Sequence, residues 1–170
     1  RNIPLLSTRE LTMLKFASPT DRIDAYFASD AEQRRRILTD EIARIPYEAL
    51  ADLDQTAPIE IDRVEWFATR EDLARTMAWL HLASRRPGLR PVTEILSLET
   101  PIPFDGEIWP YVGYKGGSEM GVLSGTWLLQ RADGRHFVYS VGFRDPDAAL
   151  DMPAAVAAME AGRDMLATTP

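Results

Sequence analysis

Three consecutive segments decide the fold of this chain: 108–117 (IWPYVGYKGG), 121–131 (GVLSGTWLLQR) and 135–143 (RHFVYSVGF). All three are rich in aromatic and β-branched residues, which are enriched in strands. The Ala-Asp-Gly sequence at 132–134, between the second and third segments, is typical of a hairpin turn. The sequence therefore predicts a three-stranded antiparallel meander.

A helix is expected after the meander. Asp145-Pro146 breaks the last strand, because proline lacks the N–H that a strand interior needs. Asp151 is suited to cap a helix that runs from Met152 to about Ala167. This helix would close the structure at its carboxy-terminal end.

Residues 1–106 have a mainly helical pattern. Apolar positions recur at helical spacing, and two capping signatures, Ser29 with Glu32 and Thr69 with Asp72, each precede such a run. The whole chain is thus predicted to have an α+β fold: a helical region, then antiparallel strands and a closing helix over residues 107–170. With 170 residues, the two regions would together form one domain or the carboxy-terminal part of one.

Composition excludes several classes of function. Without cysteine the chain can form neither disulfides nor thiolate sites, and no apolar run is long enough to span a bilayer. A net charge of −7 argues against nucleic acid as a partner. His81 and His136 lie far apart in the sequence and lack an H-E-x-x-H setting, so we assign them structural roles and expect no metal site. No dinucleotide or phosphate-loop motif is present, and no cofactor is expected.

The densest chemical signal is the sequence YKGGSE at 114–119, at the end of the first predicted strand. Glycines at 116 and 117 let a ligand approach the backbone closely, and Lys115 adds a positive charge. Such a segment suits a carboxylate or an oxyanion that develops on an attacked carbonyl. The alternative interpretation is a glycine-rich bend with a solvated lysine. A G-x-S-x-G nucleophile elbow at Ser118 is excluded because Met120 occupies its last position.

Together with the strand–turn–strand–helix that follows it, the YKGGSE segment resembles the carboxy-terminal part of class A β-lactamase-like serine hydrolases. In that family a Lys-[Thr/Ser]-Gly strand borders the active site and is followed by two antiparallel strands and a closing helix. The stretches PLLSTRELTMLKF and FATREDLARTMAWL are similar to helices of the family's helical region. The resemblance implies an incomplete β-lactamase/transpeptidase-like fold and a periplasmic or secreted enzyme.

The resemblance also implies a role for each residue of the motif. Lys115 would hold the substrate carboxylate, Gly117 would allow close approach along the strand edge, and the backbone N–H of Ser118 would be an oxyanion-hole donor. Gly116 stands where the family has a hydroxyl residue. This departure favours an ester, amide or peptide substrate over a β-lactam.

The family's nucleophile motif, Ser-x-x-Lys, and its Ser-Asp-Asn motif do not occur in these 170 residues. We therefore expect the nucleophile and an amino-terminal half to lie outside this chain, and the chain alone to be inactive and to need that half or a complementary chain as a partner. The first hypothesis is part of a serine hydrolase that forms an acyl-enzyme on a β-lactam, peptide or ester. The second is a non-catalytic binding or scaffold domain that retains the fold. A third, an independent hydrolase using Ser118 and a distant histidine, is the weakest.

Overall fold

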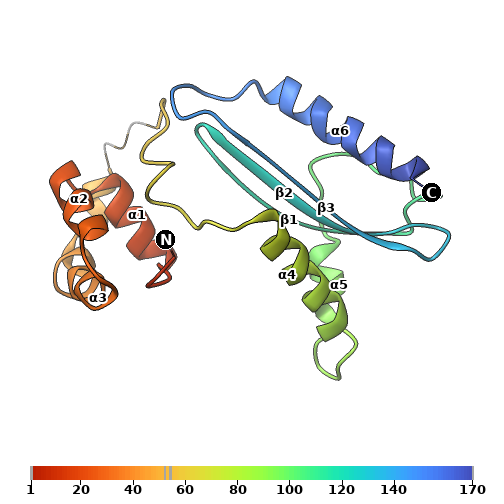
Figure 1. Ribbon diagram of the computed structural model, residues 1–170, viewed down its shortest axis with the longest axis horizontal. Coiled ribbons are helices and arrows are strands. Elements are labelled where there is room, and N and C mark those ends of the chain that lie inside the picture. The colour runs from red at the N-terminus through yellow and green to blue at the C-terminus, as the bar shows by residue number, and fades with distance from the viewer. Residues whose placement is uncertain (1, 52, 54, 170) are drawn as a thin grey trace. The chain divides into compact units, whose positions relative to one another are not determined.

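The computed structural model describes residues 2–51, 53 and 55–169 and has the predicted α+β fold. The chain divides into two compact units (Figure 1). The first comprises Arg1–Phe67 and Pro146–Ala149, and the second comprises Ala68–Asp145 and Leu150–Pro170. No helix formed by the described residues is long and apolar enough to cross a membrane.

The first unit is helical and buries one apolar cluster. Its elements are α1 (Thr8–Phe16), α2 (Thr20–Ala28), α3 (Ala31–Asp40) and two short 3₁₀ helices, η1 (Ile42–Arg44) and η2 (Tyr47–Leu50). The apolar cluster is drawn from all three α-helices and from the segments that follow them: Leu11, Met13, Leu14, Ile23, Tyr26, Leu38, Ile42 and Val64.

A charged side chain is also buried in the first unit. Lys15, on α1, has a fully buried side chain and forms an ion pair with Glu65. A buried ammonium needs such a partner, because removing a charge from water is unfavourable.

Capping residues set where these helices begin. Ser7 and Glu10 form a reciprocal capping box at the start of α1. At the start of α3 the box is formed by Asp30 and Gln33, so the predicted pair of Ser29 and Glu32 is wrong by one residue. The Ser29 hydroxyl instead donates to the Ala25 carbonyl at the end of α2.

The second unit is built on a three-stranded antiparallel sheet. Strands β1 (Tyr111–Glu119), β2 (Val122–Gln130) and β3 (His136–Arg144) lie in the order β1-β2-β3, which confirms the predicted meander. Three helices belong to this unit: α4 (Arg70–Ala83), α5 (Pro91–Leu96) and α6 (Met152–Thr168). The predicted cap of α4 by Thr69 with Asp72 and that of α6 by Asp151 are both present.

Helices cover both faces of the sheet, α6 on one and α4 with α5 on the other (Figure 1). The α6 face holds the main core, in which Trp127 of β2 is fully buried between Tyr114 of β1 and Tyr139 of β3. The Trp127 ring centroid lies 5.0 Å from that of Tyr114 and 5.1 Å from that of Tyr139. Apolar residues from α6 and from the loop before β1 complete this core, among them Met159, Ile102 and Trp109.

Two aromatic rings, one on each face of the sheet, lie over glycines. A Cβ built on Gly125 would come within 2.5 Å of the Trp127 ring, and one on Gly113 within 2.6 Å of the Tyr111 hydroxyl. Glycine at these strand positions therefore provides the space that the neighbouring ring occupies.

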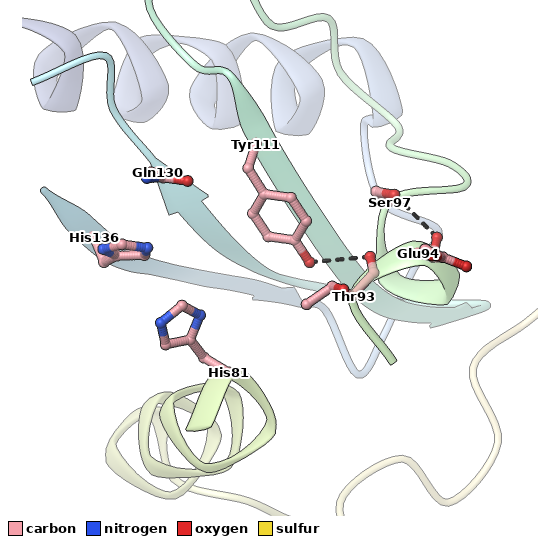
Figure 2. A pocket seen from close by; sticks show the side chains of 7 residues that line it. All are labelled: His81, Thr93, Glu94, Ser97, Tyr111, Gln130 and His136. Atoms are coloured by element: carbon pink, nitrogen blue, oxygen red, sulfur yellow. Dashed lines mark hydrogen bonds between the residues drawn. The ribbon is translucent and has the colours of Figure 1, made fainter. Parts of the chain in front are cut away.

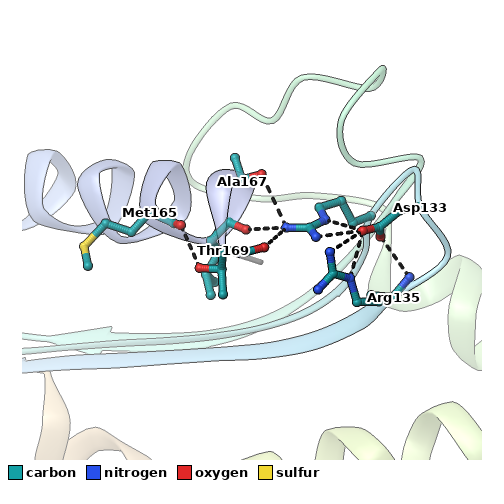
Figure 3. Close-up of polar contacts among 7 residues, drawn as sticks. Asp133, Arg135, Met165, Ala167 and Thr169 are labelled. Carbon is teal, nitrogen blue, oxygen red and sulfur yellow. Dashed lines mark hydrogen bonds and ion pairs between the residues drawn. The ribbon is translucent and has the colours of Figure 1, made fainter.

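The β2–β3 hairpin holds the end of α6 (Figure 3). The buried Arg131 donates from Nη1 to the carbonyls of Leu166 and Thr169, at 3.1 and 2.7 Å. Its Nε and Nη2 donate to Asp133, which also accepts from Arg135. The Leu166 carbonyl also accepts the Thr169 N–H, so the Arg131 guanidinium adds a second donor at a helix end where carbonyls lack full intrahelical pairing.

A candidate functional site on the edge of strand β1

The hydrogen-bond register shows which peptide groups of β1 face outward. The N–H of Arg131 donates to the Arg135 carbonyl at 2.9 Å, and that of Asp145 donates to the Gly121 carbonyl at 2.8 Å. Gly121 and Arg131, the two odd-numbered residues that flank β2, thus form hydrogen bonds on the β3 side. Because successive residues of an antiparallel strand bond to opposite neighbours, the even-numbered residues of β2 bond toward β1.

This alternation determines which way the backbone N–H and C=O groups of the predicted site residues on β1 point. Gly116 and Ser118 lie opposite Gly125 and Leu123, two odd-numbered residues of β2. Their N–H and C=O groups consequently point away from β2, toward the open side of β1. The N–H of Ser118, the predicted oxyanion donor, therefore faces outward from an edge strand.

The Tyr111 hydroxyl donates to the Thr93 carbonyl of α5, so the Tyr111 side chain lies on the sheet face that carries α4 and α5. Lys115 and Gly117 are an even number of residues away from Tyr111 along β1 and therefore lie on the same face. The Lys115 side chain is exposed, and its ammonium donates to the outward-facing carbonyl of Gly116. A Cβ built on Gly117 would meet no atom within 4 Å. This position is open to an approaching ligand.

Gly116 is different, because its space is occupied. A Cβ at this position would collide with the Tyr114 hydroxyl and would lie 2.8 Å from the carbonyl oxygen of Ser124. Tyr114 is two residues before Gly116 on the same face of β1, and burial raises the pKa of its hydroxyl. The two glycines of the motif thus have separate roles: Gly116 makes room for an aromatic ring, and Gly117 leaves open space on the sheet face that carries α4 and α5.

A second group of polar residues meets on the α4/α5 face, away from the glycine motif. His81 of α4 lies beside His136 of β3, with ring centroids 4.5 Å apart. They lie at one end of a pocket of about 330 Å³ (Figure 2). The residues that line it are His81, Thr93, Glu94, Ser97, Tyr111, Gln130 and His136.

The electrostatic environment of His81 is positive. Partial burial, the neighbouring His136 and the Arg85 guanidinium all lower the pKa of His81 below its usual value of 6.5. Arg85 Nη2 lies 3.0 Å from His81 Nε2. The sequence analysis treated the two histidines as separate structural residues and did not predict that they meet. Among the described residues, no group of three or more histidine, aspartate or glutamate side chains could hold a metal ion.

A third polar cluster, at the β2–β3 turn, is structural. Asp133 accepts hydrogen bonds from Arg131 and Arg135, which hold the pKa of its carboxyl far below the usual value. All of its partners belong to the hairpin itself. The cluster stabilises the turn and the end of α6 rather than a ligand.

The sequence matches no known family model, and a comparison with curated proteins likewise gives no match.

Proposed function

We propose that this chain carries part of the active site of a β-lactamase-like serine hydrolase, with β1 as the strand that borders the bound substrate. The observation that carries the proposal is the outward direction of the Ser118 N–H on an edge strand, beside the open position at Gly117. The order of the elements, with a meander followed by a closing helix, agrees with the arrangement that the family resemblance implies.

In this proposal an extended substrate lies along the outer edge of β1. The outward peptide groups of Gly116 and Ser118 pair with its backbone, as an added strand would. A serine hydroxyl attacks the scissile carbonyl while a base takes the hydroxyl proton, and the Ser118 N–H donates to the oxygen that becomes negative. Collapse of this intermediate expels the leaving group, and water then hydrolyses the acyl-enzyme.

Lys115 supplies the positive charge next to this edge. Its ammonium is exposed and contacts the Gly116 carbonyl, so a substrate carboxylate can reach it without displacing a buried partner. An ammonium and a carboxylate form a charge-assisted hydrogen bond, which orients the substrate. The nucleophile and its base would come from residues outside these 170, since no Ser-x-x-Lys motif is present in them.

The ring of Tyr114 supports a substrate other than a β-lactam. In the resembling family, a hydroxyl side chain occupies the position of Gly116. The Tyr114 hydroxyl and the Ser124 carbonyl fill the space that such a side chain would need here. We therefore propose an ester, amide or peptide substrate.

A complementary segment would cover the other side of the sheet. The outward peptide groups of β3 belong to its even-numbered residues, which lie opposite the even-numbered residues of β2. In the part of the chain that the structure describes, β3 is an edge strand, and such an edge can add a strand from another segment or chain. We propose that the partner carrying the nucleophile pairs here.

A non-catalytic binding domain is the second candidate. It is favoured by the absence of the nucleophile motif from the sequence, because an open β1 edge can bind an extended peptide without reacting with it. In this case Lys115 and the Ser118 N–H would contribute to affinity alone.

Labelling of the source protein with a fluorophosphonate and a fluorescent penicillin, followed by mapping of the labelled peptide, separates these candidates. We expect label on a serine outside this chain, and we expect Lys115→Ala to slow labelling while Arg35→Ala, which removes an exposed cation from the first unit, does not. Label on Ser118 would instead support an independent hydrolase. Absence of label with both probes would support the non-catalytic binding domain instead of the hydrolase.

A further inference from the structure

The pocket beside His81 and His136 is separate from the β1 edge. Its β1 residue is Tyr111, at the beginning of the strand, whereas Lys115 and Gly117 lie toward the other end. Its volume of about 330 Å³ is at the lower end of the range of small-molecule sites. Its three walls come from α4, α5 and the sheet, all of which belong to the second unit.

One end of the pocket holds two imidazole rings, and the Arg85 guanidinium lies beside one of them. Arginine is always a donor, so the bond between Arg85 Nη2 and His81 Nε2 requires a neutral His81 ring with its proton on Nδ1. Protonation of His81 breaks this bond and places a cationic imidazole between the Arg85 guanidinium and the His136 ring. A bound carboxylate relieves this repulsion, because it offers oxygen acceptors to the imidazole N–H groups.

The other end of the pocket is acidic. Figure 2 shows the histidines on one side of the Tyr111 ring and Glu94 on the other. The Tyr111 hydroxyl donates to the Thr93 carbonyl at 3.2 Å, which fixes the ring between the two ends. A ligand that spans the pocket would thus meet two imidazole rings, then the aromatic ring of Tyr111, then Glu94.

We propose that this pocket binds a small zwitterion, such as an amino acid or a short peptide, with its carboxylate against His81 and His136 and its ammonium facing Glu94. The opposite charges at the two ends fix the direction of the ligand. The aromatic surface between them accommodates an apolar linker. This proposal is independent of the hydrolase proposal, since none of these residues belongs to the β1 edge site.

Calorimetric titration of the full chain tests the proposal with three probes: 6-aminohexanoate, hexanoate and hexylammonium. They share a linker and differ in which charged end they carry. We expect 6-aminohexanoate to bind tightest, and its binding to shift the Cε1 proton resonances of both histidines in NMR spectra. Equal binding of the three probes, or no shift of either histidine at saturating 6-aminohexanoate, would overturn the proposal.

Substitutions at exposed positions inside and outside the pocket make the test specific. Glu94→Gln should weaken 6-aminohexanoate about threefold, the effect typical of an exposed ion pair, and should leave hexanoate unchanged. Glu99→Gln removes the same charge from an exposed position that does not line the pocket, and it should change neither probe. His136→Gln should weaken both carboxylate probes. An equal effect of the two glutamate variants would contradict the assigned direction of the ligand.

The affinity should also depend on pH. The charged and titratable groups around His81 are Arg85, His136, Glu94 and Tyr111. A bound carboxylate favours the protonated imidazoles, so hexanoate should bind more tightly as the pH falls from about 8 to about 5.5. Affinity that stays constant over this range would mean that the histidines do not contact the carboxylate.

Discussion

The hydroxyl of Tyr139 on β3 donates a hydrogen bond of 3.1 Å to the carbonyl of Met159 in the middle of α6. The same ring packs on Gly162, where a Cβ would contact the Tyr139 hydroxyl and lie 2.8 Å from ring atom Cζ. Burial raises the pKa of the Tyr139 hydroxyl, which therefore stays a donor at neutral pH. The sheet and the closing helix are thus joined by one tyrosine packed on one glycine.

Substitution of this pair should be non-additive. Tyr139→Phe removes the hydrogen bond and should lower the free energy of unfolding by about 1 kcal/mol. Gly162→Ala gains about 1 kcal/mol of helix propensity but should be net destabilising, because crowding against a fixed ring costs about 1–3 kcal/mol. In the double variant the hydroxyl is absent, so the added methyl group is less crowded. The double variant should therefore be about 1 kcal/mol more stable in urea unfolding than the sum of the two single effects. Strict additivity would show that the two residues do not compete for space.

The two glycines of the YKGGSE motif should respond differently to the same substitution. Gly116→Ala places a methyl group against the Tyr114 hydroxyl and the backbone oxygen of Ser124, and should destabilise the chain by about 2 kcal/mol. Gly117→Ala fills open space and should be neutral or stabilising by up to about 0.5 kcal/mol. Each variant is the control for the other in urea unfolding. A Gly116→Ala variant as stable as Gly117→Ala would contradict the packing described for Tyr114.

The sequence predicts those features that depend on residues close together along the chain. It does not predict contacts between residues that are far apart in the sequence. The meander, its turn and the cap by Asp151 follow from local patterns and are confirmed. The packing of Tyr114 over Gly116 is also local, since residues two apart share a strand face, and the two-residue alternation could have revealed it. The meeting of His81 with His136 could not be predicted, because it requires α4 to pack on a particular face of β3.

Acid should selectively remove the contribution of Asp133 to stability. Arg131 and Arg135 lower the pKa of this carboxyl in the folded state, so its stabilising effect is present above the unfolded pKa, near 3.9, and is lost as the pH falls toward the folded value. Asp133→Asn should therefore be less stable than the unmodified chain at pH 7, and the difference should shrink below about pH 4. Urea midpoints at pH 7, 5 and about 3 give this comparison. A difference that stays constant with pH would mean that the carboxylate charge is not involved.

The buried ion pair of the first unit should be more sensitive to the loss of one partner than to the loss of both. Glu65→Gln replaces the carboxylate that pairs with the fully buried Lys15 by a neutral amide and should cost about 2 kcal/mol, less than in a deeply buried pair because Glu65 is partly exposed. Combining it with Lys15→Met replaces the ammonium by an apolar side chain of similar length, and should restore most of the loss. Arg36→Met, which breaks the exposed pair with Glu32, is the surface control and should change stability by less than about 0.5 kcal/mol. A double variant no more stable than Glu65→Gln would show that the charge on Lys15 is not the source of the loss.

The isolated chain should associate through the open edge of β3. Among the described residues β3 is the last strand on its side of the sheet, and edge strands of this kind add strands from other chains. We expect light scattering after size exclusion to give a mass above that of the 19.1 kDa monomer. Val138→Lys or Ser140→Pro would disfavour strand addition at this edge and should shift the chain toward monomer, whereas Glu99→Gln should not. A folded monomer over the whole accessible concentration range would show that β3 is stable without a further strand, and would contradict the proposal that a partner chain pairs there.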